Sequence, residues 1–296
     1  MYEKIEHCPI CNSKQIGNYQ LIKDFSVSQE LFNISMCMDC LFKFTNPRPD
    51  KANIGKYYES EDYISHSNKA VNPIQVIYKI VRKYALKNKL NLINKFSEKG
   101  TLLDYGCGTG HFLQTCQKDG WKITGIEPDT KANALAVHKT NSTILTDISQ
   151  IKPNQHFNII TLWHVLEHVH DLNGIMNTLQ SILNKSGIIL IAVPNIQSFD
   201  AEIYKEHWAA WDVPRHLYHF TSKDIKTLAK KHKLKVKDIV PMKFDAYYVS
   251  YLSEEYKNKS FFKLNKYFLG AINGYKSNLK ANLNNQYSSL IYILTK

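Results

Sequence analysis

The stretch from Leu102 to Gly110, LLDYGCGTG, constrains the fold of this 296-residue chain more than any other part of its sequence. Two apolar residues lead into Asp104, and three glycines then alternate with Cys107 and Thr109. This pattern is typical of a buried parallel strand that ends in a tight glycine loop and feeds a helix, which here begins near His111. Glycines leave room for a ligand at the main chain, and a helix N-terminus adds free N–H groups and a positive dipole end.

The spacing of the glycines narrows the choice of ligand. A dinucleotide-binding loop reads GxGxxG, whereas the glycines here are spaced GxGxG. A P-loop has Lys and then Ser or Thr after its last glycine, and His111 and Phe112 stand there instead. The loop by itself indicates an adenosine-type ligand, and a glycine turn without a ligand is the alternative.

Apolar runs alternate with helical patterns beyond the glycine loop. Strands are expected at 102–104, 121–127, 142–145, 157–163, 187–193, 236–240 and 289–294. Helices are expected at 111–119, 131–139, 171–183 and 222–233. Apolar strands separated by helices indicate a parallel sheet that is covered on both faces, so the sequence predicts an α/β fold.

Two CxxC pairs near the N-terminus predict a metal site. They offer four thiolates in the two-by-two arrangement that a tetrahedral zinc requires, from Cys8, Cys11, Cys37 and Cys40. Two disulfides are the rival interpretation, but no signal segment is evident, and disulfides are rare in the cytoplasmic location that we expect. We predict a structural zinc ribbon at 1–48, with no open position on the metal. The bound zinc is expected to supply much of the stability of this N-terminal segment.

A linker and a helix follow the ribbon. Pro47 and Pro49 end it, and apolar residues then recur at helical spacing from Pro73 to about Phe96. We assign 49–96 to this linker and capping helix, which packs the ribbon onto the main domain or caps a substrate cleft.

The net charge of +12 raises the question of nucleic-acid binding. Only three of the 38 basic residues are Arg, and proteins that read bases and phosphates favour the planar fork of Arg. The chain is also rich in Asn, Ile and Tyr, so a composition bias of the whole genome explains the lysines without a nucleic-acid partner. No stretch approaches the roughly 20 apolar residues of a membrane span.

Acidic residues follow three of the expected strands. In an open α/β sheet the ligand lies outside the carboxyl ends of the strands. The first strand ends in Asp104, and the second ends in Glu127, where an acid can bind both ribose hydroxyls of a nucleoside. The third ends in Asp147 and Ile148, which are placed to hydrogen-bond to an adenine or to pack on it.

Four segments over roughly residues 97 to 200 resemble the class I S-adenosylmethionine-dependent methyltransferases: LLDYGCGTG, GIEPD, LWHVLEHV and GIILIAVPN. The resemblance implies a Rossmann-like domain at 97–296 with a mostly parallel seven-stranded sheet, and S-adenosylmethionine as methyl donor. It assigns the methionine moiety to Asp104, Gly106, Gly108 and Gly110, the ribose hydroxyls to Glu127, and the adenine to Asp147 and Ile148. The CxxC pairs and the segment HWAAWDVPRHLYHFT are similar to a bacterial subgroup of small-molecule methyltransferases, which includes sugar-modifying ones.

A different enzyme class also matches part of the sequence. His164, Glu167 and His168 fit the HxxEH pattern of a metalloprotease, in which two histidines on one helix face bind zinc and the Glu is the base. This motif directly follows a buried strand of the expected nucleoside-binding sheet, and VLEHV is what the methyltransferase family shows here. The methyltransferase is therefore the favoured interpretation.

Histidines are the candidate catalytic residues. Methyl transfer needs alignment of donor and acceptor, and a hydroxyl or acidic carbon acceptor also needs a base near neutral pH. The candidates are His164, His168 and His216, with His219 as a further one. The segment around His216 resembles an HEHxxYFS pattern of sugar C-methyltransferases, in which a His aligns with His216. The match is incomplete, because Arg215 replaces the Glu, His219 replaces the Tyr and Val213 stands where some members carry a polar residue. A His216 bonded to a backbone carbonyl beneath a loop is the structural alternative.

Other residues of these segments have two interpretations. Trp208, Trp211, Tyr218 and Phe220 form an apolar lid over the site or pack the domains together. Cys107 and Cys116 are expected to be small buried residues.

The sequence predicts a methyltransferase that acts on a small-molecule or glycan-precursor acceptor, with O- or C-methylation. One alternative is an RNA methyltransferase with a zinc-ribbon RNA-binding module, and another is a non-catalytic nucleoside-binding scaffold. The sequence leaves the acceptor and the oligomeric state open.

Overall fold

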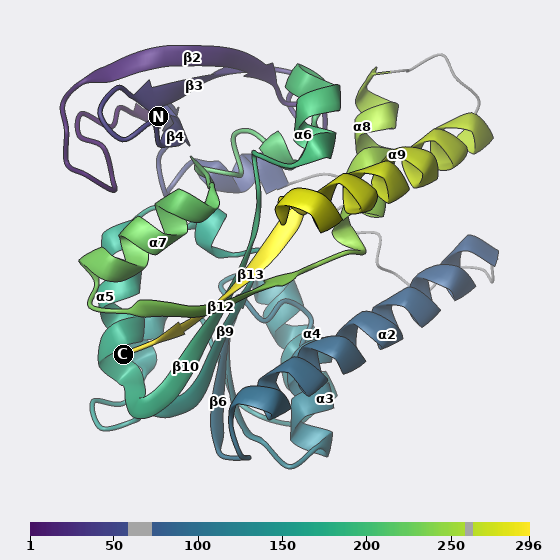
Figure 1. Cartoon of the computed structure of the whole chain (residues 1–296). Helices are drawn as coiled ribbons and strands as arrows, with labels where there is room; N and C mark the ends of the chain where they lie inside the picture. Colours follow the sequence, from purple (N-terminus) through teal and green to yellow (C-terminus); the bar gives the residue numbers. More distant parts are fainter. Residues whose placement is uncertain (59–72, 258–262) are drawn as a thin grey trace.

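A seven-stranded sheet forms the centre of the molecule. The computed structural model in Figure 1 describes residues 1–58, 73–257 and 263–296. The strands lie in the order β12-β13-β10-β9-β6-β7-β8. They are β6 (Thr101–Tyr105), β7 (Lys122–Ile126), β8 (Ile144–Leu145), β9 (Phe157–Trp163), β10 (Leu183–Pro194), β12 (Lys235–Pro241) and β13 (Ser289–Thr295). Only β13 runs antiparallel to its neighbours in this sheet, which confirms the expected mostly parallel α/β fold.

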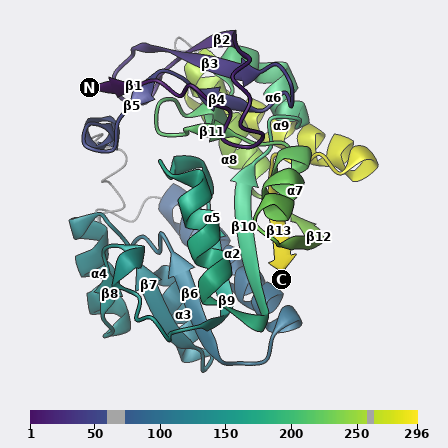
Figure 2. The same ribbon diagram turned by 90° about the vertical axis from the view of Figure 1, so that its left-hand side faces the viewer.

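Helices cover both faces of this sheet, as Figures 1 and 2 show. On one side lie α2 (Pro73–Phe96), α3 (His111–Lys118) and α4 (Thr130–Thr140), and on the other lie α5 (Leu172–Ile182) and α7 (Ser222–Lys231). Side chains alternate between two cores along each strand, since successive residues point to opposite faces. Leu102 packs in the same cluster as Phe112 of α3, whereas Leu103 packs in the same cluster as Met176 of α5.

The N-terminal segment forms a separate small sheet. Its strands are β2 (Ile16–Lys23), β3 (Leu31–Cys37) and β4 (Lys43–Thr45), and β1 (Tyr2–Glu3) pairs with β5 (Arg48–Pro49) beside them. A fourth strand, β11 (Tyr218–His219), pairs with β4 in an antiparallel register. No strand was expected at 218–219, and β11 ties the N-terminal segment to the part of the chain that follows the main sheet strand β10. The boundary at 48 stays a prediction.

Two helices close the C-terminal part. Residues 241–288 carried no expected element, but α8 (Asp245–Lys257) and α9 (Lys263–Asn284) pack against each other there. Glycines let the two backbones approach closely, because a Cβ added at Gly270 would lie 2.7 Å from the Cα of Tyr251. The remaining helical pieces are α6 (Phe199–Tyr204) and the 3₁₀ turns η1 (Ile54–Tyr58), η2 (Ile148–Gln150), η3 (Leu166–His168), η4 (Lys205–His207) and η5 (Ala209–Trp211). Across the described ranges, no helix combines the length and apolarity that a membrane span needs.

Candidate functional site

The glycine loop joins β6 to α3 at the carboxyl edge of the sheet. Gly106, Gly108 and Gly110 have φ angles of 75°, 52° and 74°, in the left-handed region that favours glycine. A Cβ at Gly106 would lie 2.5 Å from Cγ2 of Val165, and a Cβ at Gly110 would lie 2.9 Å from the Cα of Ala136. A Cβ at Gly108 would meet no described atom within 4 Å. Two glycines therefore permit close packing, and the middle one faces open space.

Two carboxylates lie beside this loop. Asp104, at the end of β6, is 2% exposed and accepts a hydrogen bond from Oγ1 of Thr161 at 2.6 Å. Burial raises the pKa of Asp104 to about 7, although the Thr161 hydroxyl and the charge of Lys89 lower it. Glu127, just after β7, accepts the N–H of Gly108 at 2.8 Å and the N–H of Asp129 at 3.0 Å. Burial likewise raises the pKa of Glu127.

A third carboxylate follows β8. The Asp147 carboxylate caps η2 by accepting a hydrogen bond from the Ser149 N–H at 2.9 Å. In turn, Oε1 of Gln150 accepts a hydrogen bond from the Asp147 N–H at 3.1 Å. Burial raises the pKa of Tyr105 to about 12, and the charges of Asp147 and Glu127 add to this effect. Ile148 is half-buried and packs against the core. The structure thus brings all seven expected cofactor-binding residues to the carboxyl ends of β6, β7 and β8.

The indole N–H of Trp163, at the end of the neighbouring strand β9, has no hydrogen-bond partner among the described residues. Its Nε1 is buried, so a ligand atom or water is needed there. The ring packs edge-on against Phe112, and Nζ of Lys89 lies 4.3 Å from the ring centroid. Burial lowers the pKa of Lys89, and the charges of Asp104 and Asp245 oppose that effect. Sequence reasoning missed Lys89, because it comes from α2, outside the recognised motifs.

His164 is held between two carboxylates. Its Nε2 lies 2.8 Å from Oδ2 of Asp245, and its Nδ1 lies 3.3 Å from Oε1 of Glu167. Burial disfavours the charged ring, but the Asp245 and Glu167 carboxylates raise the pKa of His164 to about 10. His164 is therefore protonated at neutral pH, which works against a role as a base.

His168 and His216 lie face to edge, with ring centroids 4.6 Å apart. Nδ1 of His168 lies 3.0 Å from the carbonyl oxygen of Arg215 and also 3.0 Å from the Tyr58 hydroxyl. Burial and the neighbouring His216 lower the pKa of His168 to about 4. Nδ1 of His216 lies 2.9 Å from the carbonyl oxygen of Ala210, as in the structural alternative, and the residue is 8% exposed.

The metalloprotease pattern is not realised. It requires His164 and His168 on one helix face, whereas the backbone of His164 is left-handed with φ 57° and only Leu166–His168 forms a short 3₁₀ turn. His164 therefore turns to Asp245, while His168 turns to the segment around His216. Nε2 of His219 lies 3.1 Å from Oγ1 of Thr45.

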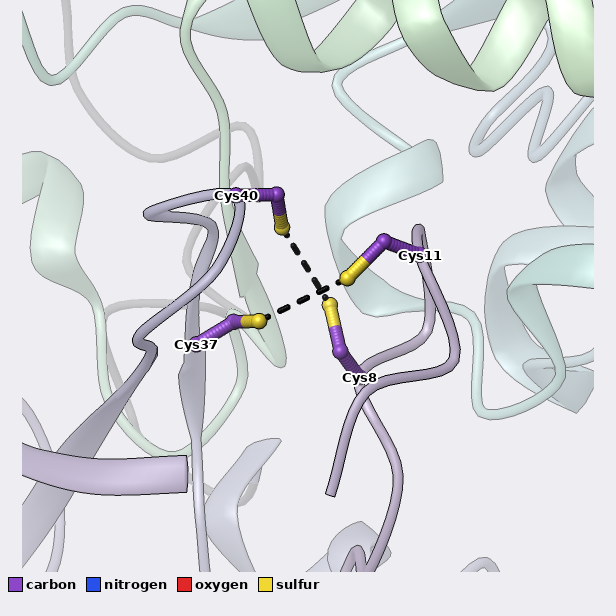
Figure 3. A group of neighbouring side chains, drawn as sticks. All are labelled: Cys8, Cys11, Cys37 and Cys40. Atoms are coloured by element: carbon purple, nitrogen blue, oxygen red, sulfur yellow. Dashed lines mark hydrogen bonds between the residues drawn. The ribbon is translucent and has the colours of Figure 1, made fainter. Parts of the chain in front are cut away.

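Four cysteine sulfurs converge from two loops of the N-terminal segment (Figure 3). The Sγ atoms of Cys8 and Cys40 are 3.5 Å apart, as are those of Cys11 and Cys37. These separations exceed a disulfide bond of about 2.05 Å, and all four thiols are free. All four sulfurs lie within 4.8 Å of one another, which fits the tetrahedral set that one zinc ion requires.

The tryptophans of the aromatic segment are core residues. Trp208 and Trp211 are 1% and 6% exposed and pack edge-to-face against each other. They share a cluster with Ile22 and Phe32 of the N-terminal sheet, so the domain-packing interpretation of these residues is confirmed. Cys107 and Cys116 are buried, as expected.

A buried ion network anchors the segment that carries His216. Arg215 is 3% exposed, and its Nη2 lies 2.9 Å from Oδ1 of Asp24 and 2.7 Å from Oδ1 of Asp212. Its Nη1 donates to the carbonyl oxygen of Tyr57 at 2.8 Å. Burial alone would raise the pKa of Asp24, but hydrogen bonds from Arg215 and Ser28 bring it below its ordinary value. The sequence alone gave no signal for this contact across 191 positions.

Arg215→Leu is expected to lower the free energy of unfolding by about 3–5 kcal/mol, because it leaves the Asp24 carboxylate buried and unpaired. Urea unfolding followed by circular dichroism measures the change. Adding Asp24→Asn to this variant removes the unpaired charge and should restore part of the loss. Equal stability of Arg215→Leu and the unmodified protein would contradict the importance of the network.

Comparisons with known proteins agree with this geometry. A family model described as a methyltransferase domain matches residues 78–238, more than half of the chain. A ubiquinone biosynthesis O-methyltransferase of Rhodopseudomonas palustris strain BisB5 is 29% identical over 100 residues, which cover 32% of this chain and 40% of that protein. Another, from Bradyrhizobium sp. strain ORS 278, is 25% identical over 135 residues, covering 42% and 52%. The chain thus spans about half, or less, of the length of these relatives.

Solved structures share the fold. Magnesium protoporphyrin IX methyltransferase from Synechocystis PCC 6803 with bound SAH has a TM-score of 0.54 and 13% identity, and the match covers 83% of this chain and 100% of that one. An O-methyltransferase from a Brevibacillus brevis trans-AT PKS multienzyme, in complex with S-adenosyl-L-homocysteine, has a TM-score of 0.50 and 18% identity, with 76% and 77% covered. At these identities the likeness concerns the fold alone.

Proposed function

The chain belongs to the methyltransferase-domain family, and from that premise we propose that it transfers the methyl group of S-adenosylmethionine to a hydroxyl group of a small-molecule acceptor. The observation that carries this proposal is the meeting of a glycine loop with three carboxylates at the carboxyl ends of β6, β7 and β8. S-adenosylmethionine supplies a methyl group on a positively charged sulfur. A hydroxyl acceptor is favoured because the curated relatives are named O-methyltransferases.

The donor-binding residues have free capacity for the nucleoside. Each oxygen of Glu127 accepts one backbone N–H, and an ionised carboxylate offers about four acceptor sites. Glu127 can therefore accept both ribose hydroxyls without losing its present bonds. Gly108 leaves open space at the main chain, and buried Asp104 offers a carboxyl oxygen as acceptor to the amino group of the methionine moiety. Asp147 and Ile148 flank the position expected for the adenine.

The acceptor is proposed to bind on the side of His168 and His216. Because only an N–H can donate to a carbonyl, the Nδ1 contacts of both rings leave a lone pair on Nε2 when the rings are neutral. Either lone pair can face an acceptor hydroxyl. His164 stays a weaker candidate, since both its nitrogens face carboxylates. Alignment of acceptor and donor is worth on the order of 7–11 kcal/mol of barrier in well-oriented reactions.

The four-cysteine cluster is proposed to hold one structural zinc. Its sulfurs supply a complete tetrahedral set, which leaves no position for a substrate. Cys37 of the cluster ends β3, a strand of the sheet that β11 joins, and His216 precedes β11 by two residues. We therefore expect the zinc to stabilise the acceptor side of the enzyme rather than to take part in the reaction.

The substrate class is tested with S-adenosylmethionine labelled on its methyl group. Incubation with the low-mass fraction and, separately, with the RNA fraction of cells that carry this gene should label the low-mass fraction only. Label in RNA alone would support the RNA methyltransferase, and label in neither fraction would support the non-catalytic scaffold. Binding to bulk RNA should also be negligible at physiological salt, whereas an RNA enzyme would bind it with a steep dependence on salt concentration.

A further inference from the structure

The buried Glu167 carboxylate has one oxygen without a hydrogen-bond partner among the described residues. The residue is 0% exposed, and this oxygen is Oε2. The other oxygen, Oε1, lies 3.3 Å from Nδ1 of His164. A buried carboxylate oxygen without a partner is unfavourable, so a water, an ion or a ligand atom is needed there.

Two imidazole rings lie close to the Glu167 carboxylate. The donor atoms of Glu167, His168 and His216 all lie within 4.8 Å of one another. The Nδ1 atoms of both histidines are engaged by backbone carbonyls, of Arg215 and of Ala210. Metal-binding histidines commonly donate one ring N–H in this way, because it fixes the ring and leaves the other nitrogen free to bind the ion. Nε2 of His216 lies 3.8 Å from the nearest recorded carboxylate oxygen, of Asp212, beyond hydrogen-bond distance.

The backbone holds these residues in place before any ion binds. Glu167 and His168 belong to η3, which is separated from the end of β9 by two residues, whereas His216 comes from the segment before β11. The Leu217 N–H donates to the carbonyl oxygen of Glu167 at 2.7 Å and so ties the two segments together. A site whose ligands are fixed by neighbouring contacts is preorganised for its ion.

We propose that Glu167, His168 and His216 form a second divalent-metal site, separate from the four cysteines, at which the acceptor oxygen binds. Three protein ligands leave open positions on the ion, in contrast to the closed cysteine set. Two imidazoles and one carboxylate suit a first-row transition ion such as Zn²⁺ or Co²⁺ better than Mg²⁺ or Ca²⁺. The ion requires donor distances of about 2.0–2.2 Å, so the three side chains close by a small movement around it.

The position of this site suits the transfer reaction, and its role rests on the proposed function. Val165, two residues before Glu167, packs against the glycine loop, because a Cβ at Gly106 would lie 2.5 Å from Cγ2 of Val165. An ion there binds the oxygen of an acceptor hydroxyl and favours loss of its proton to water. The oxygen then bonds to the methyl carbon as the carbon–sulfur bond breaks, and S-adenosylhomocysteine leaves with the bonding electron pair on sulfur.

The site is tested by titration of the full-length protein, zinc-loaded at its cysteines, with Co²⁺ alone. We expect about one further Co²⁺ per chain, with visible absorption but without the thiolate-to-cobalt band that marks the cysteine cluster. Glu167→Gln and His216→Gln should each weaken Co²⁺ binding at least about 10-fold. His170→Gln, a control at a half-buried histidine whose Nε2 lies 3.1 Å from the Pro49 carbonyl oxygen, should bind Co²⁺ normally.

A crystal soaked in Co²⁺ gives a readout that needs no variant, in case a substitution prevents folding. An anomalous peak among the three side chains supports the site. The proposed site is overturned if the zinc-loaded protein binds no Co²⁺, if the anomalous peak is absent, or if both Gln variants bind Co²⁺ as the unmodified protein does. Because neither measurement includes S-adenosylmethionine or an acceptor, failure here leaves methyl transfer intact, and failure of methyl transfer leaves the ion-binding result intact.

Discussion

Glu127→Ala is expected to lower the affinity of the chain for S-adenosylmethionine by about 100-fold or more. The carboxylate is proposed to accept two ribose hydroxyls, and a hydrogen bond to a charged group contributes about 1.5–3 kcal/mol. Loss of two such bonds costs about 3 kcal/mol or more, and each 1.4 kcal/mol is about tenfold in affinity. Isothermal titration calorimetry of the variant and of the unmodified protein measures the difference.

Two further variants separate ribose binding from local damage. Glu127→Gln keeps the size of the side chain and one acceptor oxygen, so an intermediate loss is expected. Asp129→Asn should bind S-adenosylmethionine normally, because the Asp129 side chain is exposed and caps α4, a role that Asn also fills. Affinity unchanged in Glu127→Ala would contradict the assignment of this residue to the donor.

Cys37→Ser is expected to release the zinc and to unfold the N-terminal sheet. Cys37 is 0% exposed, and structural zinc contributes about 10–16 kcal/mol of apparent binding free energy in small metal-dependent domains. That amount matches or exceeds the whole stability of a typical domain, about 5–15 kcal/mol. Elemental analysis should show a fall from about one zinc per chain to near zero. Amide hydrogen exchange should show loss of protection in β3, β4 and β11.

Cys116→Ser is the matched control for this experiment. Cys116 is also buried, but it lies in α3 on the main sheet, away from the cluster. It should retain its zinc and its protected N-terminal strands, with only a modest loss of overall stability. Purified unmodified protein without zinc, or a Cys37→Ser variant that keeps its zinc, would contradict the four-cysteine assignment.

Local sequence was enough to predict that the three proposed donor-binding carboxylates lie at one edge of the sheet. Asp104 lies near the end of β6, Glu127 follows β7 and Asp147 lies just after β8, and adjacent parallel strands bring their carboxyl ends to one edge. The three glycines of the loop adopt left-handed angles, which glycine favours. These relations depend on residues close in sequence and on a common sheet topology, so they can be read without the structure.

Long-range pairing explains most of what the sequence did not predict. β11 has only two residues and no detectable periodicity, although it joins β4 and places His216 near Thr45, whose hydroxyl donates to the His216 carbonyl oxygen. Lys89 and Asp245 reach the site from helices at either end of the main domain. The region of α8 and α9 has no clear apolar stripe, because glycines rather than large side chains form part of the contact.

The HxxEH motif is present in the sequence but does not form the helical zinc site that its spacing indicates. Spacing alone puts both histidines on one helix face, but the left-handed turn at His164 separates them. Glu167 and His168 then meet His216, a residue about 50 positions away that no local motif links to them. The sequence identified Glu167 and His168 as candidate metal ligands, but it did not indicate that His216 lies beside them.

The carboxyl edge of β6, β7 and β8 is proposed to bind a methyl donor. Calorimetric titration of the unmodified, zinc-loaded protein with S-adenosylmethionine and with S-adenosylhomocysteine tests it most directly. The proposed function predicts that both ligands bind with a stoichiometry of about one per chain and that each displaces the other. Absence of binding by either ligand to the folded protein would contradict it.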